Sequence, residues 1–151
     1  MKILVLCTGN SARSILLEHI LRRGGVDAFS AGSQPTGQVH PQSIKLVAAK
    51  GFDVAAARSK SWDEFEAVDA PQMDAVITVC ASAAGETCPI WPGAPVRAHW
   101  GVDDPAKADL ADWDVAFETA FDVLERRAKA FLAMDTTRSL KDRLDAAGAL
   151  Q

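Results

Sequence analysis

Short apolar runs alternate along the chain with longer amphipathic segments. Residues 2–6 form a continuous aliphatic run, which is typical of a parallel strand buried on both faces. Residues 26–30, 75–79 and 96–100 are similar, and residues 52–54 are a candidate for one more short strand. Strands of this kind require helices to cover them.

Between these runs, apolar residues recur every three or four positions, which predicts helices. They are expected at residues 13–23, 41–51, about 62–68 and 110–131. Alternating strands and helices indicate an α/β three-layer sandwich with a four-stranded, mostly parallel sheet. We expect residues 1–133 to form this domain and residues 134–151 to be a C-terminal tail that is weakly helical.

Composition narrows the functional classes. A chain of 151 residues with 48% hydrophobic content suits one globular domain. A net charge of −4 disfavours nucleic acid and anionic membranes as partners. No apolar run reaches the length of a membrane span, so the chain is expected to be cytoplasmic. Its three cysteines cannot form a closed set of disulfides.

The segment after the first strand carries the strongest chemical signal. Cys7 and Arg13 flank a short polar loop that leads into a helix, and Ser14 follows them. Gly9 and Asn10 tolerate positive φ, so backbone amides can turn inward as an anion-binding nest. Such a nest would favour a Cys7 thiolate and hold a tetrahedral oxyanion. The expected substrate-binding residues are Thr8, Gly9, Asn10, Ser11, Ala12, Arg13 and Ser14.

The remaining candidates are ambiguous by themselves. Cys80 follows a predicted strand and Cys88 follows a segment of small residues, so the pair is either inert or redox-active. Seven intervening residues do not match the usual zinc-ligand spacing. Asp104 before Pro105 is what helix capping by itself would select, with acid catalysis as the alternative.

These stretches together resemble the low-molecular-weight protein tyrosine phosphatase superfamily and, within it, the thioredoxin-coupled arsenate reductases. The similarity extends to about residue 132. The stretches that carry it are residues 7–14, Ser30-Ala31-Gly32, Val79-Cys80, Cys88-Pro89-Ile90, His99-Trp100-Gly101 and Asp103-Asp104-Pro105.

The resemblance implies arsenate reduction, with phosphate as a substrate analogue. Cys7 would be the nucleophile, Arg13 the oxyanion ligand and Asp104 the general acid. Cys80 and Cys88 would relay the oxidation to thioredoxin, or to a glutaredoxin or low-molecular-weight thiol. No cofactor is implied. The alternatives are a phosphatase, which needs no cysteine pair, and a non-enzymatic oxyanion-binding or redox-sensing module.

Some of these reductases bind potassium beside the loop. Asn10, Glu18 and Ser30 match three of the ligand positions, and Lys60 falls on the fourth. We therefore expect no metal, with the ammonium group of Lys60 replacing the cation and supporting the loop. A solvent-exposed Lys60 is the alternative.

Overall fold

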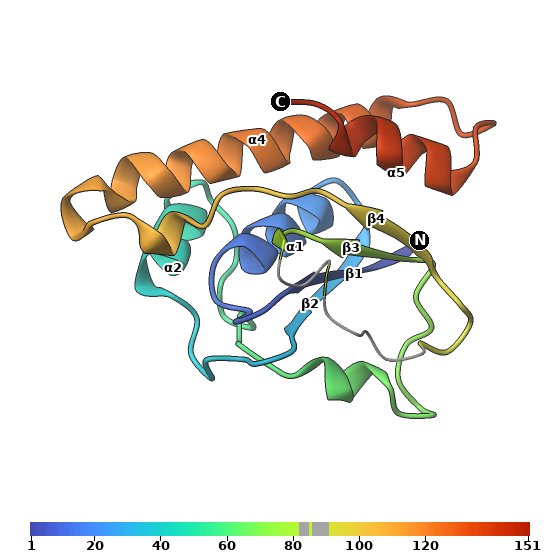
Figure 1. Ribbon diagram of the computed structural model, residues 1–151, viewed down its shortest axis with the longest axis horizontal. Helices are drawn as coiled ribbons and strands as arrows, with labels where there is room; N and C mark the ends of the chain where they lie inside the picture. The colour runs from blue at the N-terminus through green and yellow to red at the C-terminus, as the bar shows by residue number, and fades with distance from the viewer. Residues whose placement is uncertain (82–84, 86–90) are drawn as a thin grey trace.

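A parallel sheet organises the chain. The computed structural model describes residues 1–81, 85 and 91–151, and the sheet has the order β2-β1-β3-β4 (Figure 1). All three pairings are parallel, which confirms the predicted α/β fold class. The strands are β1 (Lys2–Cys7), β2 (Asp27–Gly32), β3 (Ala75–Thr78) and β4 (Val96–His99).

Strand β1 lies in the middle of the sheet, and both of its faces are covered. Ile3 and Val5 belong to the cluster formed with the α-helices, whereas Leu4 and Leu6 belong to a second cluster on the opposite face. All four side chains are fully buried. Successive strand residues point to opposite faces, so burial on both sides requires an unbroken apolar run.

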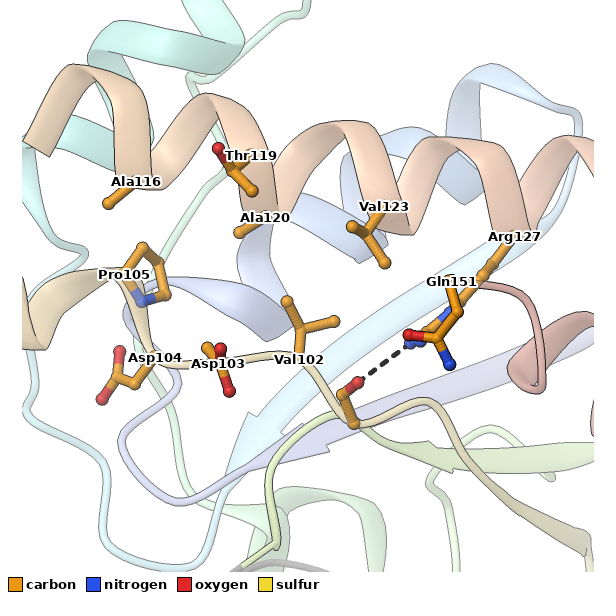
Figure 2. Close-up of a pocket in the computed structure, with 11 residues that line it drawn as sticks. Val102, Asp103, Asp104, Pro105, Ala116, Thr119, Ala120, Val123, Arg127 and Gln151 are labelled. Carbon is orange, nitrogen blue, oxygen red and sulfur yellow. Dashed lines mark hydrogen bonds between the residues drawn. The ribbon is translucent and has the colours of Figure 1, made fainter.

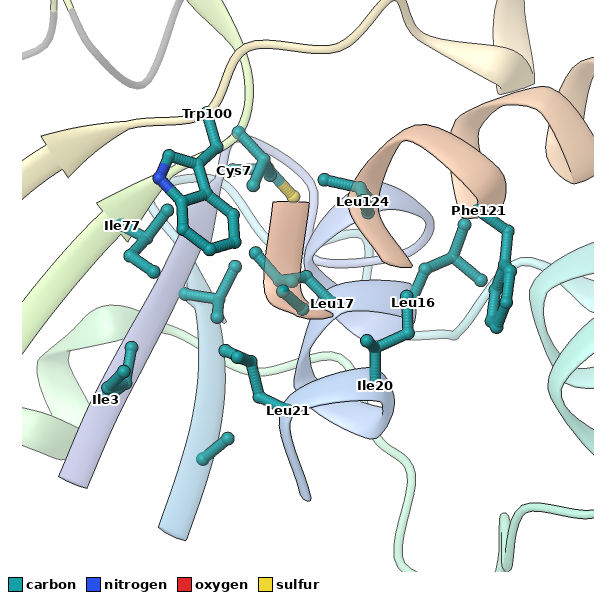
Figure 3. Packing of buried hydrophobic residues seen from close by; sticks show 14 of the residues in the cluster. Ile3, Cys7, Leu16, Leu17, Ile20, Leu21, Ile77, Trp100, Phe121 and Leu124 are labelled. Atoms are coloured by element: carbon teal, nitrogen blue, oxygen red, sulfur yellow. The ribbon is translucent and has the colours of Figure 1, made fainter. Parts of the chain in front are cut away.

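The helices α1 (Arg13–Arg23), α2 (Pro41–Ala49), α4 (Trp113–Ala133) and α5 (Leu140–Gly148) contribute to the first of these clusters. Figure 3 shows apolar side chains of α1 packed between the sheet and α4. The opposite face is covered by the short 3₁₀ helix η1 (Trp62–Phe65) together with Met73 and Trp91. In the described part of the chain, no helix is long and apolar enough to cross a membrane.

The prediction of a strand at residues 52–54 is wrong. The backbone amide of Phe52 donates to the carbonyl of Val47 at 3.0 Å, so this residue closes the end of α2. Its ring packs against Phe121 and is covered by the guanidinium of Arg23. The segment is thus used to terminate a helix and fill the core, and it joins no strand.

The long helix also begins later than the periodicity predicts. Two short 3₁₀ helices, η2 (Pro105–Lys107) and η3 (Leu110–Asp112), precede α4. Leu110 is 73% exposed and contributes nothing to the core. The apolar stripe that is buried along α4 starts at Phe117.

The C-terminal residues pack tightly on the end of β4. Leu144 and Ala147 of α5 are fully buried, and the indole nitrogen of Trp100 donates to the carbonyl of Leu144 at 2.9 Å. A Cβ atom on Gly148 would lie 2.6 Å from the Trp100 ring, so only glycine permits this approach. Helix α5 of the C-terminal tail therefore packs into the hydrophobic core.

Replacing Leu144 by alanine should lower the free energy of unfolding by about 2–5 kcal/mol, because it leaves a cavity between α5 and the sheet. The matched control is Leu110→Ala, which removes the same atoms from an exposed position and should change stability by less than about 0.5 kcal/mol. Urea denaturation measures both. Equal effects of the two substitutions would contradict the packing of α5.

Candidate active site

Two of the three cysteines follow neighbouring strands at the point where the chain changes direction across the sheet. The chain passes from β1 to β2 on one side, whereas β3 leads to β4 on the other, so a crevice is expected at the carboxyl ends of β1 and β3. Cys7 ends β1, and Cys80 lies two residues beyond β3. The Thr8 hydroxyl is 3.7 Å from the Cys80 sulfur. The predicted site residue Cys88 lies outside the described residues.

The loop after β1 turns its carbonyl groups outward. Three of its carbonyl oxygens accept hydrogen bonds of 3.0 Å from backbone amides of residues 34–40; they are those of Thr8, Gly9 and Ser11. In a planar trans peptide the N–H group points opposite to the C=O group. The amides that follow these carbonyls therefore face the inside of the loop, and that of Asn10 donates to the Cys7 sulfur at 3.2 Å. This orientation is the one that an anion-binding nest requires, and the binding of an anion by these residues stays a prediction.

Two residues make this tight path possible. Asn10 has a φ of 47°, in the left-handed region that asparagine tolerates, whereas the expected positive φ at Gly9 is not observed. Gly32 pairs with Cys7 in the sheet, and a Cβ atom there would lie 2.4 Å from the carbonyl oxygen of Thr8. Any side chain at position 32 would displace the loop.

A chain of buried hydrogen bonds leads to the sulfur of Cys7. The side-chain amide of Asn10 donates to Ser14 at 2.8 Å and to Ser30 at 3.0 Å. The Ser30 hydroxyl donates to the buried carboxylate of Glu18. Since Ser14 accepts from Asn10, its own proton is available for the Cys7 sulfur, 2.9 Å away. The network thus directs a hydrogen-bond donor at the Cys7 sulfur.

Two of the residues that match the cation-ligand positions, Asn10 and Glu18, accept hydrogen bonds from the protein. The Asn10 side-chain oxygen accepts from the Lys60 backbone amide at 2.9 Å, and Glu18 accepts from Arg22 at 2.7 Å as well as from Ser30. The side-chain oxygens expected beside a cation thus accept hydrogen bonds in this structure, and the absence of a metal stays a prediction. The ammonium group of Lys60 donates to the Arg58 carbonyl at 3.2 Å. Burial lowers the pKa of Lys60, and the negative charge of Glu18 opposes that shift.

Arg13 and Asp104 meet beside the loop. Their nearest charged atoms are 3.4 Å apart, and Arg13 also donates to the Val102 carbonyl at 3.0 Å. The second carboxylate oxygen of Asp104 accepts from the amide of Ala106 at 3.0 Å. Asp104 therefore caps η2 and faces Arg13 at the same time, so helix capping and acid catalysis are both compatible with one geometry.

Sequence reasoning missed Val102 and Arg22. A backbone carbonyl such as that of Val102 leaves no signal in the sequence. Arg22 follows Glu18 by four residues in a predicted helix, so this ion pair was detectable from spacing.

A thiol at the end of a buried strand, amides directed at it and an arginine in the following helical turn define a class of enzymes that bind oxyanions and attack them with cysteine. The chain belongs to the low-molecular-weight phosphotyrosine protein phosphatase family, which it matches over residues 2–145.

The chain is similar to several arsenate reductases. The chain is 37% identical to the arsenate reductase of Halalkalibacterium halodurans, over 83% of this chain and 91% of that protein. A solved arsenate reductase in its phosphate-binding state has a TM-score of 0.68 at 26% identity and covers 87% of this chain and 96% of its own. The thioredoxin-dependent arsenate reductase of Corynebacterium glutamicum has a TM-score of 0.62 at 22% identity, covering 85% and 58% respectively.

His40 makes the stability of the start of α2 depend on pH. Its ring nitrogen accepts from the amide of Gln42 at 3.1 Å and so caps α2, which requires that nitrogen to be unprotonated. The ring packs against Trp113 and Phe117. Burial lowers the pKa of His40 below 6.5, and the charge of Asp104 opposes the shift only in part.

Because the fold favours neutral His40, its contribution to stability is present above pH 6.5 and is lost as the pH falls through the lower pKa of the folded state. His40→Asn keeps a good capping residue that does not titrate. The melting temperature of the variant should therefore fall less than that of the wild type when the pH is lowered from about 7.5 to about 5. Parallel losses in the two proteins would show that His40 is not responsible.

Proposed function

We propose that this protein reduces arsenate to arsenite with Cys7 as the nucleophile, and that Cys80 and Cys88 carry the oxidation to an external thiol donor. Three facts support the proposal. The chain belongs to a family of oxyanion-attacking enzymes, its curated relatives are named arsenate reductases, and a second thiol lies next to the nucleophile's loop.

In the first step, arsenate enters the nest and the Cys7 thiolate attacks arsenic. An As–O bond breaks as the S–As bond forms, and Asp104 supplies a proton so that the oxygen leaves as water. Arg13 and the inward amides hold the oxyanion charge. The ion pair between Arg13 and Asp104 keeps both groups on the same side of the loop. The product is a Cys7 thioarsenate.

In the second step, the Cys80 thiolate attacks the sulfur of Cys7. The electron pair of the S–As bond passes to arsenic, which leaves as arsenite, and a Cys7–Cys80 disulfide forms. Cys88 then attacks Cys80, which restores the Cys7 thiolate and leaves a Cys80–Cys88 disulfide. The two electrons gained by arsenic come from these thiols, and an external dithiol returns them. Thioredoxin is the expected donor, as in the relative from Corynebacterium glutamicum, with a glutaredoxin or low-molecular-weight thiol as the alternative.

The observation that carries the proposal is the position of Cys80. A phosphatase needs Cys7, Arg13 and Asp104 only, and hydrolysis of a phosphocysteine has no use for a second buried thiol. Cys80 is 3% exposed and its sulfur lies 3.7 Å from the hydroxyl of Thr8, the loop residue that follows Cys7. This supports reduction over hydrolysis and over a binding module without activity.

Replacing each cysteine separates these functions. Cys7→Ser should abolish both arsenate reduction and phosphate-ester hydrolysis, because the serine hydroxyl is a far weaker nucleophile. Cys80→Ser and Cys88→Ser should reduce arsenate turnover by at least about 10²-fold while leaving slow ester hydrolysis within about threefold of the wild type. Arsenite release with thioredoxin and its reductase measures turnover.

Thiol titration after one challenge with arsenate distinguishes the alternatives. The reductase loses two thiols per chain and releases one arsenite, a phosphatase releases phosphate from esters without loss of thiols, and a binding module does neither. Full thioredoxin-coupled turnover by Cys88→Ser would falsify the relay.

We also propose that Lys60 and the hydrogen bonds at Glu18 replace a bound cation in supporting the loop. Potassium chloride should then change neither the melting temperature nor arsenate turnover relative to sodium chloride at equal ionic strength. Lys60→Asp, which supplies a carboxylate in place of the ammonium, is the matched variant and should become potassium-sensitive. A potassium-specific gain in the wild type would contradict this assignment.

A further inference from the structure

A buried arginine holds the segment that carries Asp104. Residues 101–105 run beside the middle of α4 and enclose with it a pocket of about 410 Å³ (Figure 2). Arg127 forms the end of this pocket together with the C-terminal residue Gln151. Its side chain is 6% exposed, which is unusual for an arginine and costs free energy unless its donors are satisfied.

The guanidinium of Arg127 connects two segments of the chain. One nitrogen donates to the Gly101 carbonyl at 3.0 Å, drawn as the dashed line in Figure 2, and another donates to the Leu150 carbonyl at 2.8 Å. Gly101 lies three residues before Asp104, and Leu150 follows α5. The arginine therefore ties the C-terminal segment to the acid-bearing segment.

Consecutive carbonyls of this segment are held by two different arginines. Arg127 binds the carbonyl of Gly101 and Arg13 binds that of Val102, each at 3.0 Å. The amide of Val102 is fixed in addition by the carbonyl of Val79 at 3.1 Å. Arg127 thus fixes the backbone at Gly101, three residues before Asp104, and so helps to place the Asp104 carboxylate beside Arg13. Its contact lies outside the loop of residues 7–14.

We propose that Arg127 is a positioning residue for the general acid, which it keeps aligned by anchoring residues 101–102 to α4 and to the C-terminal segment. The inference rests on the proposed role of Asp104 in protonating the departing oxygen. Loss of the anchor should leave oxyanion binding intact and weaken proton donation.

Proton donation matters most for a poor leaving group, because a good one departs without help. Phosphate-ester hydrolysis allows this comparison, with phenyl phosphate as the poor and 4-nitrophenyl phosphate as the good substrate. The ratio of the two kcat values does not depend on how much of a variant is folded. It therefore reports on the acid even where a substitution lowers stability.

Asp104→Asn is the reference and should lower kcat for phenyl phosphate by about 10²–10⁴-fold, with a much smaller loss for the nitrophenyl ester. Arg127→Met should lower kcat for phenyl phosphate about tenfold and change KM less than about twofold. Arg127→Lys, which keeps one donor group, should recover part of the loss. The matched control Arg126→Met removes the same charge from the neighbouring, exposed residue that contacts Gln151, and should leave the ratio unchanged.

The double variant makes the test decisive. In the Asp104→Asn background, Arg127→Met should have no further effect on the ratio, because the group that it positions is already absent. An equal effect in both backgrounds, or an unchanged ratio in Arg127→Met alone, overturns the positioning role while leaving the proposed function intact. If Asp104→Asn does not change the ratio, the acid assignment itself is wrong and the inference falls with it.

Discussion

The outward hydrogen bonds of the loop carbonyls are the constraint on which the site depends. Thr8, Gly9 and Ser11 each give their carbonyl oxygen to an amide of residues 34–40, and the planar peptide then turns the following amide toward the sulfur of Cys7. The positive end of α1 adds to the same field. An acidic chain can thereby bind an anion, because its attraction is local and depends on fixed backbone dipoles rather than on net charge.

The other groups reach this point from separate parts of the fold. Cys80 arrives through the pairing of β3 with β1, whereas Asp104 arrives through the segment between β4 and α4. The ion pair of Arg13 with Asp104 is partly exposed, so it contributes little to stability. Its effect is on position, since it keeps the Arg13 guanidinium and the Asp104 carboxylate on one side of the loop. Buried hydrogen bonds through Ser14 and Asn10 likewise hold the sulfur of Cys7, the proposed nucleophile.

Local patterns predicted most elements well because they depend on neighbours in sequence. The run of residues 2–6 and the helix at residues 13–23 lie where expected, since burial on both faces of a strand and on one face of a helix each leaves a clear period. The errors lie where tertiary contacts decided. Phe52 closes a helix instead of joining a strand, and Leu110 lies in a separate exposed 3₁₀ turn before α4 begins.

By itself, the sequence determined the elements of the α/β fold and the chemistry of the first loop, because spacing within one strand, turn and helix is enough to place Cys7, Arg13 and Ser14 together. Only the tertiary structure decided which distant groups join them. Four features depend on strand order and on backbone atoms, which no single segment of the sequence reveals. They are the approach of Cys80 to Thr8, the contacts of Asp104 with Arg13 and Ala106, the carbonyl of Val102 and the burial of Arg127.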